Sequence, residues 1–286
     1  MKGLGNVAFE DKVNAAIKQL EEGLERITTD EDFIRWLDVQ ARFHKYSPNN
    51  TILIVMQRPD ATRVAGYRAW QKMGRQVRRG EQAIKILAPL TRRVTLEDDD
   101  GNEEQVQRII GFKLVNVFDV SQTDGEPLPE LDVRIDGDSP EAQAITESLA
   151  AFAEESGIPI IYEELNENIG GYFNVMTNSI AINTKSSANQ QAKTLAHELG
   201  HALLHADLDE ETTESQRETE AEAVAYIVAR HFGMDPGDTS FQYIAAFSRG
   251  DISIMKASMS RIAKGANTII EHVVANSEHS TEAVSA

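Results

Sequence analysis

The chain has 286 residues, of which 41% are hydrophobic and 26% charged, a balance that is typical of a folded protein with room for two ordinary domains. It contains no cysteine, which excludes disulfides and thiolate metal sites and leaves histidine and carboxylate side chains as candidate metal ligands. Its apolar runs, such as Ile52–Met56, are too short to span a membrane, and residues 1–10 lack the apolar core of a signal peptide. We therefore expect a cytoplasmic protein with no membrane partner.

The net charge of −18 is distributed unevenly along the chain. Residues 1–93 hold 17 Lys+Arg against 11 Asp+Glu, a net charge of +6, whereas residues 94–286 hold 11 against 35, a net charge of −24. An acidic protein as a whole repels nucleic acid, but a basic first third can bind it by itself. The asymmetry predicts two domains with different partners.

Three helices are predicted in the first 60 residues. Apolar residues recur on one face of the first, at Val13, Ile17, Leu20 and Leu24. Asp30 is a candidate cap of the second helix, and Ser47 followed by Pro48 predicts the start of a third, which ends at Arg58.

Residues 63–93 form a basic stretch in which Glu81 is the only acid. Tyr67 and Trp70 are interleaved with its nine cations. Cations hold a phosphate backbone while flat rings stack on unpaired bases, so the pattern is typical of a surface that grips single strands without reading their sequence. A basic turn beside a structural tryptophan would have the same composition.

Two strands, Ile84–Leu96 and Val106–Phe118, are predicted to form a hairpin, because Asp100-Gly101 between them is a turn signal. We expect the first domain to cover residues 1–123. The Asp, Gly and Pro residues of 124–139 predict a linker.

The second domain is expected to cover residues 140–274. Its predicted elements are a helix over 140–156, a strand over 158–162, a hairpin of 170–175 and 179–183, and helices over 188–205, 212–232 and beyond. The small and polar residues 275–286 predict a disordered tail. The fold class is therefore α+β, with a β-hairpin in the first domain and a small antiparallel sheet and a helical core in the second.

Within the predicted helix 188–205, the sequence reads His197-Glu198-x-x-His201. Residues four apart share one helix face, with Cβ atoms roughly 6 Å apart, so the two imidazoles can hold one metal ion. Glu198 lies about 100° around the helix, where its carboxylate can take a proton from a water molecule beside the metal. This is the zinc metallopeptidase signature, and its apolar neighbours favour chemistry over a chance match, because a buried cluster without a metal would strand polar groups.

Catalytic zinc usually has three protein ligands and an open position for water. Asp207 has the spacing of one third-ligand scheme, but Leu204 stands where that scheme needs a helix-breaking glycine. The next helix offers Glu218 and Glu222, four apart on an inward face, while Glu220 is expected on the solvated side.

This arrangement resembles the Glu-zincins, whose second helix carries Glu-x-x-x-Asp. The resemblance implies that Glu218 binds zinc, or another divalent ion such as Mn, and that Glu222 hydrogen-bonds His197 from the position of the Asp; Glu222 remains the alternative ligand. In zincins an edge strand lies above the metal and pairs with an extended peptide. Residues 179–183 directly precede the motif helix and are our candidate for this strand.

Longer motifs connect the first domain to a second family. Residues 47–50, 65–81 and 117–123 resemble the N-terminal domain of ArdC-type antirestriction proteins, and the two metal-site helices are similar to the metallopeptidase domain attached to it. In that family the N-terminal domain binds single-stranded DNA, and the proteins, encoded on conjugative plasmids and phages, can protect incoming DNA from restriction. The resemblance implies DNA contacts at Tyr67, Arg68, Trp70, Lys72, Arg75, Arg78 and Arg79.

Three hypotheses follow. In the first, the chain is an antirestriction-type protein of a mobile element that binds single-stranded DNA and carries a zinc peptidase for an unknown protein substrate, with Tyr172, Tyr226 and His231 as candidate oxyanion partners. In the second, it is a non-catalytic DNA-protecting protein with a structural metal site. In the third, it is a regulator protease that cleaves a repressor, which would require sequence-specific binding to duplex DNA.

Overall fold

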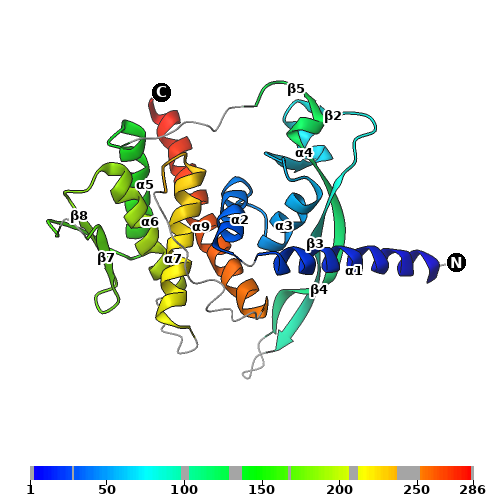
Figure 1. Ribbon diagram of the computed structural model, residues 1–286, viewed down its shortest axis with the longest axis horizontal. Coiled ribbons are helices and arrows are strands. Elements are labelled where there is room, and N and C mark those ends of the chain that lie inside the picture. Colours follow the sequence, from blue (N-terminus) through cyan, green and yellow to red (C-terminus); the bar gives the residue numbers. More distant parts are fainter. Residues whose placement is uncertain are drawn as a thin grey trace. The chain divides into compact units, whose positions relative to one another are not determined.

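The protein divides into two compact units, each of which combines helices with small sheets (Figure 1). Unit 1 comprises residues 1–26 and 49–127, and unit 2 comprises residues 27–48 and 128–286. The computed structural model describes residues 3–27, 29–97, 103–128, 137–166, 169–205, 212–236 and 252–284. The predicted α+β class with two domains is confirmed.

Unit 1 consists of antiparallel strands covered by helices. Its elements are α1 (Gly3–Glu25), α3 (Pro48–Gln57), β1 (Val64–Gly66), α4 (Tyr67–Lys72), β2 (Arg75–Val77), β3 (Ile84–Glu97), β4 (Glu103–Asp119), the 3-10 helix η1 (Val120–Gln122) and β5 (Thr123–Gly125). The first sheet has the order β1-β4-β3, and β2 pairs with β5 in a second. Helix α3 begins at Pro48 as predicted, because proline lacks the N–H that the first helical turn leaves unpaired.

Two side-chain amides attach α3 to the edge of β3. Asn50 donates to the carbonyl of Leu87 and accepts from its N–H, both at 2.9 Å. Gln57 makes the same pair of bonds to Lys85, at 2.8 and 2.9 Å. The amides take the place of a further strand, so the backbone groups at the start of this sheet edge are satisfied.

Strands β3 and β4 form the predicted hairpin, with Ile84 opposite Val117 at its base and a β-bulge at Leu90/Thr91. The base is buried in unit 1, whereas the residues further out are half-buried or exposed. We call residues 88–97 of β3 and 103–113 of β4 the arm. The predicted turn at residues 98–102 lies outside the described residues.

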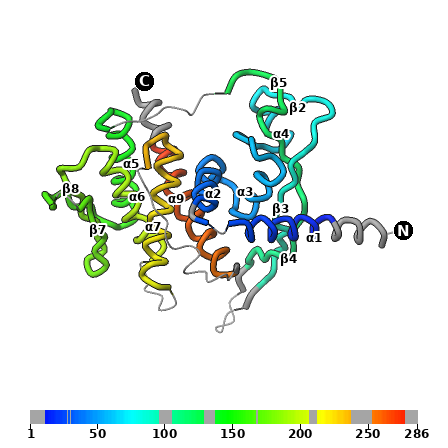
Figure 2. The backbone as a smooth tube through the Cα atoms, in the orientation of Figure 1, coloured from blue at the N-terminus to red at the C-terminus, as the bar shows by residue number. Residues whose placement is uncertain are grey.

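Unit 2 consists of helices and one three-stranded sheet (Figure 2). Its elements are α2 (Asp30–Arg42), α5 (Pro140–Glu155), β6 (Ile160–Glu163), β7 (Gly171–Asn174), β8 (Ser179–Asn183), α6 (Ala188–His205), α7 (Glu214–His231) and α9 (Ile252–Val284). The sheet order is β6-β8-β7, with β6 parallel and β7 antiparallel to β8. The expected antiparallel sheet is thus a mixed one, because the chain between β6 and β7 is long enough to bring β7 to the far side of β8.

Helix α2 belongs to unit 2, although we expected residues 1–123 to form one domain. Asp38 accepts hydrogen bonds from the Tyr226 hydroxyl at 3.0 Å and from Arg230 Nε at 2.8 Å, so its polar edge is tied to α7. The cap of α2 is Thr29 rather than Asp30: the Thr29 hydroxyl accepts from the N–H of Asp32 at 3.2 Å.

The ends of the second expected domain also differ from the sequence prediction. Of the linker 124–139, residues 124–125 end β5 and Ser139 caps α5, while residues 129–136 lie outside the described residues. Helix α9 continues to Val284, so the backbone is helical in a segment for which we expected disorder from residue 275. Alanine and glutamate in this segment favour a helix, which the small polar composition concealed.

Candidate metal centre

Helices α6 and α7 approach each other closely in unit 2. Leu195, Ala196 and Leu199 of α6 are fully buried, and α7 is buried over its second half. At the crossing, a Cβ on Gly200 would lie 3.0 Å from the Cα of Ala221. The absence of a side chain at Gly200 therefore allows the short distance between the two helices.

Three side chains converge across this contact. Nε2 of His197 lies 3.1 Å from Nε2 of His201, as the spacing of four residues predicts. The carboxylate of Glu218 on α7 is 3.6 Å from the first nitrogen and 3.3 Å from the second. The imidazoles are mostly buried, whereas 59% of the Glu218 side chain is exposed, so the cluster is open to water on that side.

The donor set of this cluster fits a divalent metal ion. A tetrahedral zinc site has metal–ligand distances of about 2.0–2.2 Å, which corresponds to ligand–ligand distances of roughly 3.3–3.5 Å. Here the two Nε2 atoms are 3.1 Å apart, Oε1 of Glu218 lies 3.3 Å from His201, and Oε2 of Glu218 lies 3.6 Å from His197. Two imidazoles and one carboxylate are also ligands that zinc and manganese accept. The residues present can thus hold one divalent ion.

Protonation of the two imidazoles is coupled, since both Nε2 atoms face the same point. Burial lowers the pKa of His197, but hydrogen bonds to Glu218 and Glu222 outweigh it and raise that pKa to about 9. Burial and the neighbouring His197 lower the pKa of His201 to about 4. A metal ion bound to both Nε2 atoms would therefore displace a proton from His197.

Glu222 orients His197 from behind. Its Oε2 lies 3.0 Å from Nδ1 of His197, and its Oε1 lies 3.3 Å from Nζ of Lys193. A carboxylate on Nδ1 keeps a proton on that nitrogen, so Nε2 is the nitrogen that gives up its proton and offers its lone pair when a metal binds. The geometry thus separates the two glutamates between which the sequence could not choose: Glu218 faces the Nε2 atoms and Glu222 does not.

Glu198 lies beside the three converging groups and is 8% exposed. Burial raises its carboxyl pKa, which the neighbouring His197 and the backbone N–H of Phe173 partly oppose. Phe173 belongs to β7, so this strand touches the carboxylate expected to act as the base. A buried carboxylate with a raised pKa is suited to accept a proton near neutral pH.

Glu220 is not solvated, contrary to the sequence prediction; its exposure is 0%. It accepts from Nε of Arg261 at 3.0 Å and from Gln216 at 3.2 Å, and it lies 3.1 Å from Nε2 of His205. The opposite side of α7 is therefore covered by α9. Because Arg261 is 41 residues away in the chain, helical periodicity alone could not reveal it, although His205, four residues after His201, was a signal.

The expected substrate strand is also different. β8, residues 179–183, is the central strand and is buried throughout, so it cannot pair with a further peptide. β7 is the edge strand that packs against α6, where a Cβ on Gly171 would meet Thr194 at 2.8 Å. Proximity in sequence to the motif helix did not predict the order of strands in the sheet.

The candidate oxyanion partners do not gather at the cluster. The Tyr226 hydroxyl donates to Asp38, and Nδ1 of His231 is 3.0 Å from the carbonyl of Ala41, so both side chains face α2. The Tyr172 hydroxyl donates to Glu163 at 3.1 Å. Asp207, the other candidate ligand, lies outside the described residues.

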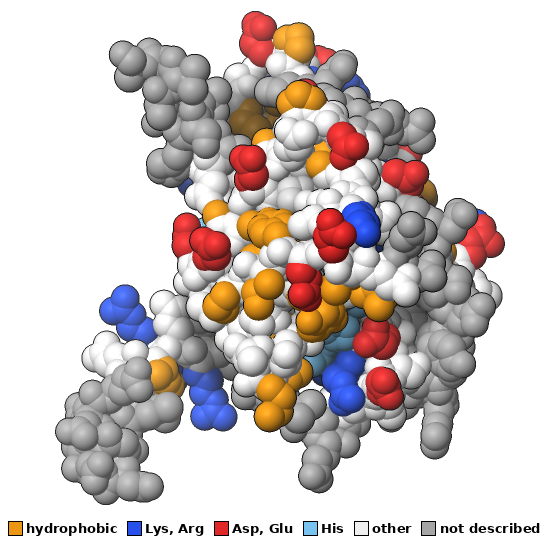
Figure 3. Space-filling model, turned by 90° about the vertical axis from the view of Figure 1, so that its left-hand side faces the viewer, with side chains coloured by type: hydrophobic (Ala, Val, Ile, Leu, Met, Phe, Trp, Pro, Cys, Tyr) orange, Lys and Arg blue, Asp and Glu red, His pale blue; other side chains and the backbone are white. Residues whose placement is uncertain are grey.

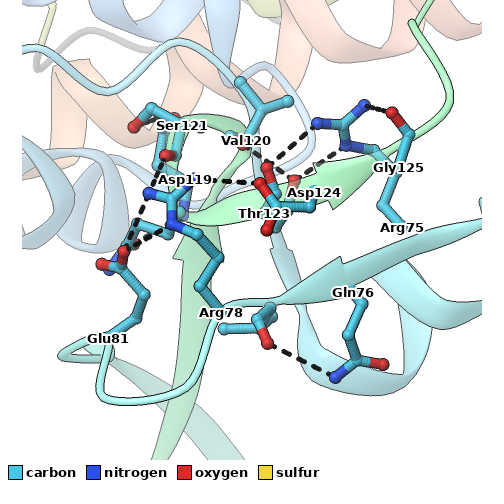
Figure 4. A network of polar contacts seen from close by, with 12 residues as sticks. Arg75, Gln76, Arg78, Glu81, Asp119, Val120, Ser121, Thr123, Asp124 and Gly125 are labelled. Carbon is cyan, nitrogen blue, oxygen red and sulfur yellow. Dashed lines mark hydrogen bonds and ion pairs between the residues drawn. The ribbon is translucent and has the colours of Figure 1, made fainter.

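In unit 1, Trp70, Arg75 and Arg78 make contacts that stabilise the fold, and Figure 4 shows those of the two arginines. Trp70 is 1% exposed and donates from Nε1 to the carbonyl of Phe118 at 2.8 Å, so it cannot stack on a base. Arg75 donates to Thr123 Oγ1 at 2.8 Å, and Arg78 pairs with Glu81 at 2.8 Å and with Asp124 at 3.4 Å. Arg78 is exposed despite these bonds. Tyr67, Arg68, Lys72 and Arg79 are exposed as well, and the Tyr67 hydroxyl accepts a hydrogen bond from Gln76.

Tyr67 and Arg79 line an open hollow of about 770 Å³, together with Gln76, Val77, Arg78, Glu81, Phe118 and Asp124. Arg68, Lys72 and Arg79 form no ion pair with any other described residue. The composition of residues 63–93 correctly predicted a basic stretch. It could not distinguish cations that stabilise the fold through hydrogen bonds and ion pairs from cations that are exposed to water.

Two family models match this chain. The N-terminal domain of anti-restriction factor ArdC matches residues 8–118, and the IrrE N-terminal-like domain of the peptidase M78 model matches residues 153–237, which contain all the residues of the metal centre. The chain is an ArdC-type protein. No helix among its described residues has the length and hydropathy needed to cross a lipid bilayer.

Relatives of this ArdC-type chain are distant. An uncharacterized protein of Bacillus anthracis is 27% identical over 312 aligned positions, which cover 93% of this chain and 53% of the relative. The chain thus spans about half the length of that curated relative. Two crystal structures of the antirestriction protein ArdC from plasmid R388 are also similar. The metal-free structure is 22% identical, with 82% of this chain and 86% of that chain covered and a TM-score of 0.47. The Mn(II)-bound structure is 20% identical, with 90% of this chain and 97% of that chain covered and a TM-score of 0.49.

Proposed function

We propose that this ArdC-type protein is an antirestriction protein that binds single-stranded DNA through unit 1 and carries a zinc-dependent peptidase centre in unit 2. The convergence of His197, His201 and Glu218, with Glu198 beside them, is the observation that carries the peptidase assignment. The ArdC N-terminal family match carries the DNA assignment.

His197, His201 and Glu218 would hold the metal, and Glu222 keeps His197 in the required tautomer. A bound divalent ion would supply Lewis-acid polarisation of a peptide carbonyl and acidify water in the site. Glu198 accepts a proton from the attacking water at its carboxylate and passes it to the amide nitrogen that leaves. The backbone N–H of Phe173 favours the ionised form of that carboxylate and lowers its pKa.

We propose β7 as the strand that receives an extended peptide substrate. It is an edge strand, it packs against α6, and its Phe173 contacts Glu198. A peptide that added to this edge would run past the catalytic carboxylate, with backbone hydrogen bonds that do not depend on its sequence. The pockets that receive its side chains would then determine which peptide sequences bind.

Single-stranded DNA would be held by exposed side chains of the basic stretch, among them Tyr67, Arg68, Lys72 and Arg79. Figure 3 shows a face of the protein on which acidic side chains are scattered among hydrophobic ones. Unit 2 has 12 Lys+Arg against 30 Asp+Glu, a net charge of −18, whereas unit 1 has 16 of each. We therefore expect DNA to bind unit 1 alone and to dissociate as salt rises.

Glu198→Gln is the test of the peptidase assignment. The amide keeps the size of the carboxyl group but cannot accept the proton, so zinc should still bind at one ion per chain while cleavage is lost. Proteomes of cells producing the wild-type or variant protein are compared for new peptide termini, and both are scored for protection of DNA from restriction. Cleavage that persists in the variant would refute the assignment; protection without cleavage would identify a DNA-protecting protein whose metal is structural.

A further inference from the structure

The arm carries a pair of like charges that its own fold does not explain. Arg92 on β3 and Arg108 on β4 are direct cross-strand partners, an arrangement that destabilises a ladder. Both are exposed, and neither guanidinium forms an ion pair with another described residue. By contrast, Arg75 and Arg78 in the same unit are fully engaged by carbonyl and carboxylate groups.

The register sorts the arm into two chemically different faces. Lys113 is opposite Ala88, four residues before Arg92 on β3, so these cations share one face with Arg108. Phe112 is opposite Pro89 and Ile109 is opposite Thr91, which places both on the other face, together with the exposed Arg93 opposite Gln107. Their exposures are 46% and 56%, and Ile110, the unpaired residue of the bulge, is 62% exposed. Three large apolar side chains on a thin hairpin form a patch that marks a contact surface.

We propose that the arm is a contact surface for single-stranded nucleic acid that passes around the hairpin, so that Arg92 and Arg108 hold phosphates on one face and Phe112 stacks on an unpaired base on the other. The inference rests on the proposed function, since it names a part of unit 1 that the strand contacts. Phosphates relieve the repulsion between the paired arginines. Unpaired bases offer apolar faces to Phe112 and the isoleucines, whereas a duplex hides those faces.

Fluorescence anisotropy of a labelled oligothymidylate, titrated with the full chain over a series of salt concentrations, tests the inference. Arg92→Gln/Arg108→Gln should weaken binding about tenfold and reduce the slope of log affinity against log salt by about 1.4, at about 0.7 for each lost phosphate contact. Phe112→Ala should weaken binding about five- to hundredfold through lost stacking and leave the slope unchanged.

Lys45→Gln/Lys264→Gln is the matched control, because it removes two exposed positive charges from unit 2 and should leave affinity and slope unchanged. The arm variants should melt at the wild-type temperature or slightly above it, since the replaced side chains are exposed and Arg92 and Arg108 repel each other. A melting temperature lowered by the arginine replacements would mean that the pair has a structural role, and it would overturn the proposal.

Other outcomes separate this inference from the proposed function. Suppose that the arm variants bind the oligonucleotide as well as the wild-type chain does, and that Arg68→Gln/Arg79→Gln weakens this binding. The arm proposal is then refuted, while DNA binding by unit 1 stands. If Arg92→Gln/Arg108→Gln loses affinity for duplex and single strand equally and Phe112→Ala has no effect, the arm is a general polyanion surface and the assignment to single strands is wrong. If the wild-type chain binds no single strand, both proposals fail together.

Discussion

Arg261→Met should strongly destabilise unit 2, because it leaves the carboxylate of Glu220 buried without its main counter-charge. Glu220 is 0% exposed and accepts two hydrogen bonds from Arg261, one of them at 3.0 Å. Removing one member of a buried ion pair costs about 3–5 kcal/mol. Gln216 and His205 would still contact Glu220, so we expect the lower end, about 3 kcal/mol.

The double replacement Glu220→Leu/Arg261→Met is the decisive comparison. An apolar pair strands no charge, so the double variant should recover much of the loss, with a coupling free energy of about 2 kcal/mol. The chain has two tryptophans, Trp36 in unit 2 and Trp70 in unit 1. In a Trp70→Phe background, the fluorescence of Trp36 during urea unfolding therefore reports unit 2 alone. Additive losses in the double variant, or a single loss below about 1 kcal/mol, would refute this reasoning.

Three further predictions concern unit 2. Gly200→Ala places a Cβ 3.0 Å from the Cα of Ala221, so overpacking of about 1–3 kcal/mol should exceed the helix gain of about 1 kcal/mol and weaken zinc binding. Gly265→Ala is the control in unfolding and zinc titrations: its Cβ meets only side-chain atoms, the nearest at 3.3 Å, so it should keep a helix gain of up to about 1 kcal/mol and leave zinc affinity unchanged. Glu222→Gln should lower zinc affinity about 10- to 100-fold in competition with a chromophoric chelator, and unchanged affinity would exclude its role on His197. His44, whose pKa burial and the nearby His231 lower from 6.5 to about 4, should make unfolding pH-dependent. As pH falls, His44 is protonated in the unfolded state before it is protonated in the folded state. Its full contribution to the free energy of unfolding is therefore present above pH 6.5 and is lost as the pH falls toward 4. This loss would be about 3 kcal/mol for a fully buried ring and is about 1–2 kcal/mol for the half-buried ring of His44. His44→Gln should flatten that decline, and identical pH curves for both proteins would contradict the assignment.

The sequence predicted correctly those features of the structure that depend on residues close together in the chain. The pairing of His197 with His201 follows from helix geometry, and the inward face of Glu218 and Glu222 follows from the same periodicity. The start of α3 and the β3–β4 hairpin likewise depend on residues close together in the chain.

The sequence predictions were wrong where a segment far away in the chain determines the surroundings of a residue. Glu220 was placed in solvent because a helix is usually exposed on one side, yet α7 is covered on that side by Arg261 of α9. Trp70 and Arg75 looked like nucleic-acid ligands because their partners, Phe118 and Thr123, are 48 residues away. The order β6-β8-β7 reflects how the strands pair in space, so β8 became central although it directly precedes the motif helix.

X-ray absorption at the zinc edge of the zinc-loaded protein tests the central claim most directly. The account predicts one zinc per chain, with two imidazole nitrogens and carboxylate oxygen at about 2.0–2.2 Å, and a change in the oxygen shell in Glu218→Ala but not in Glu222→Ala. A spectrum without imidazole scattering, or one that Glu218→Ala leaves unchanged, would contradict it.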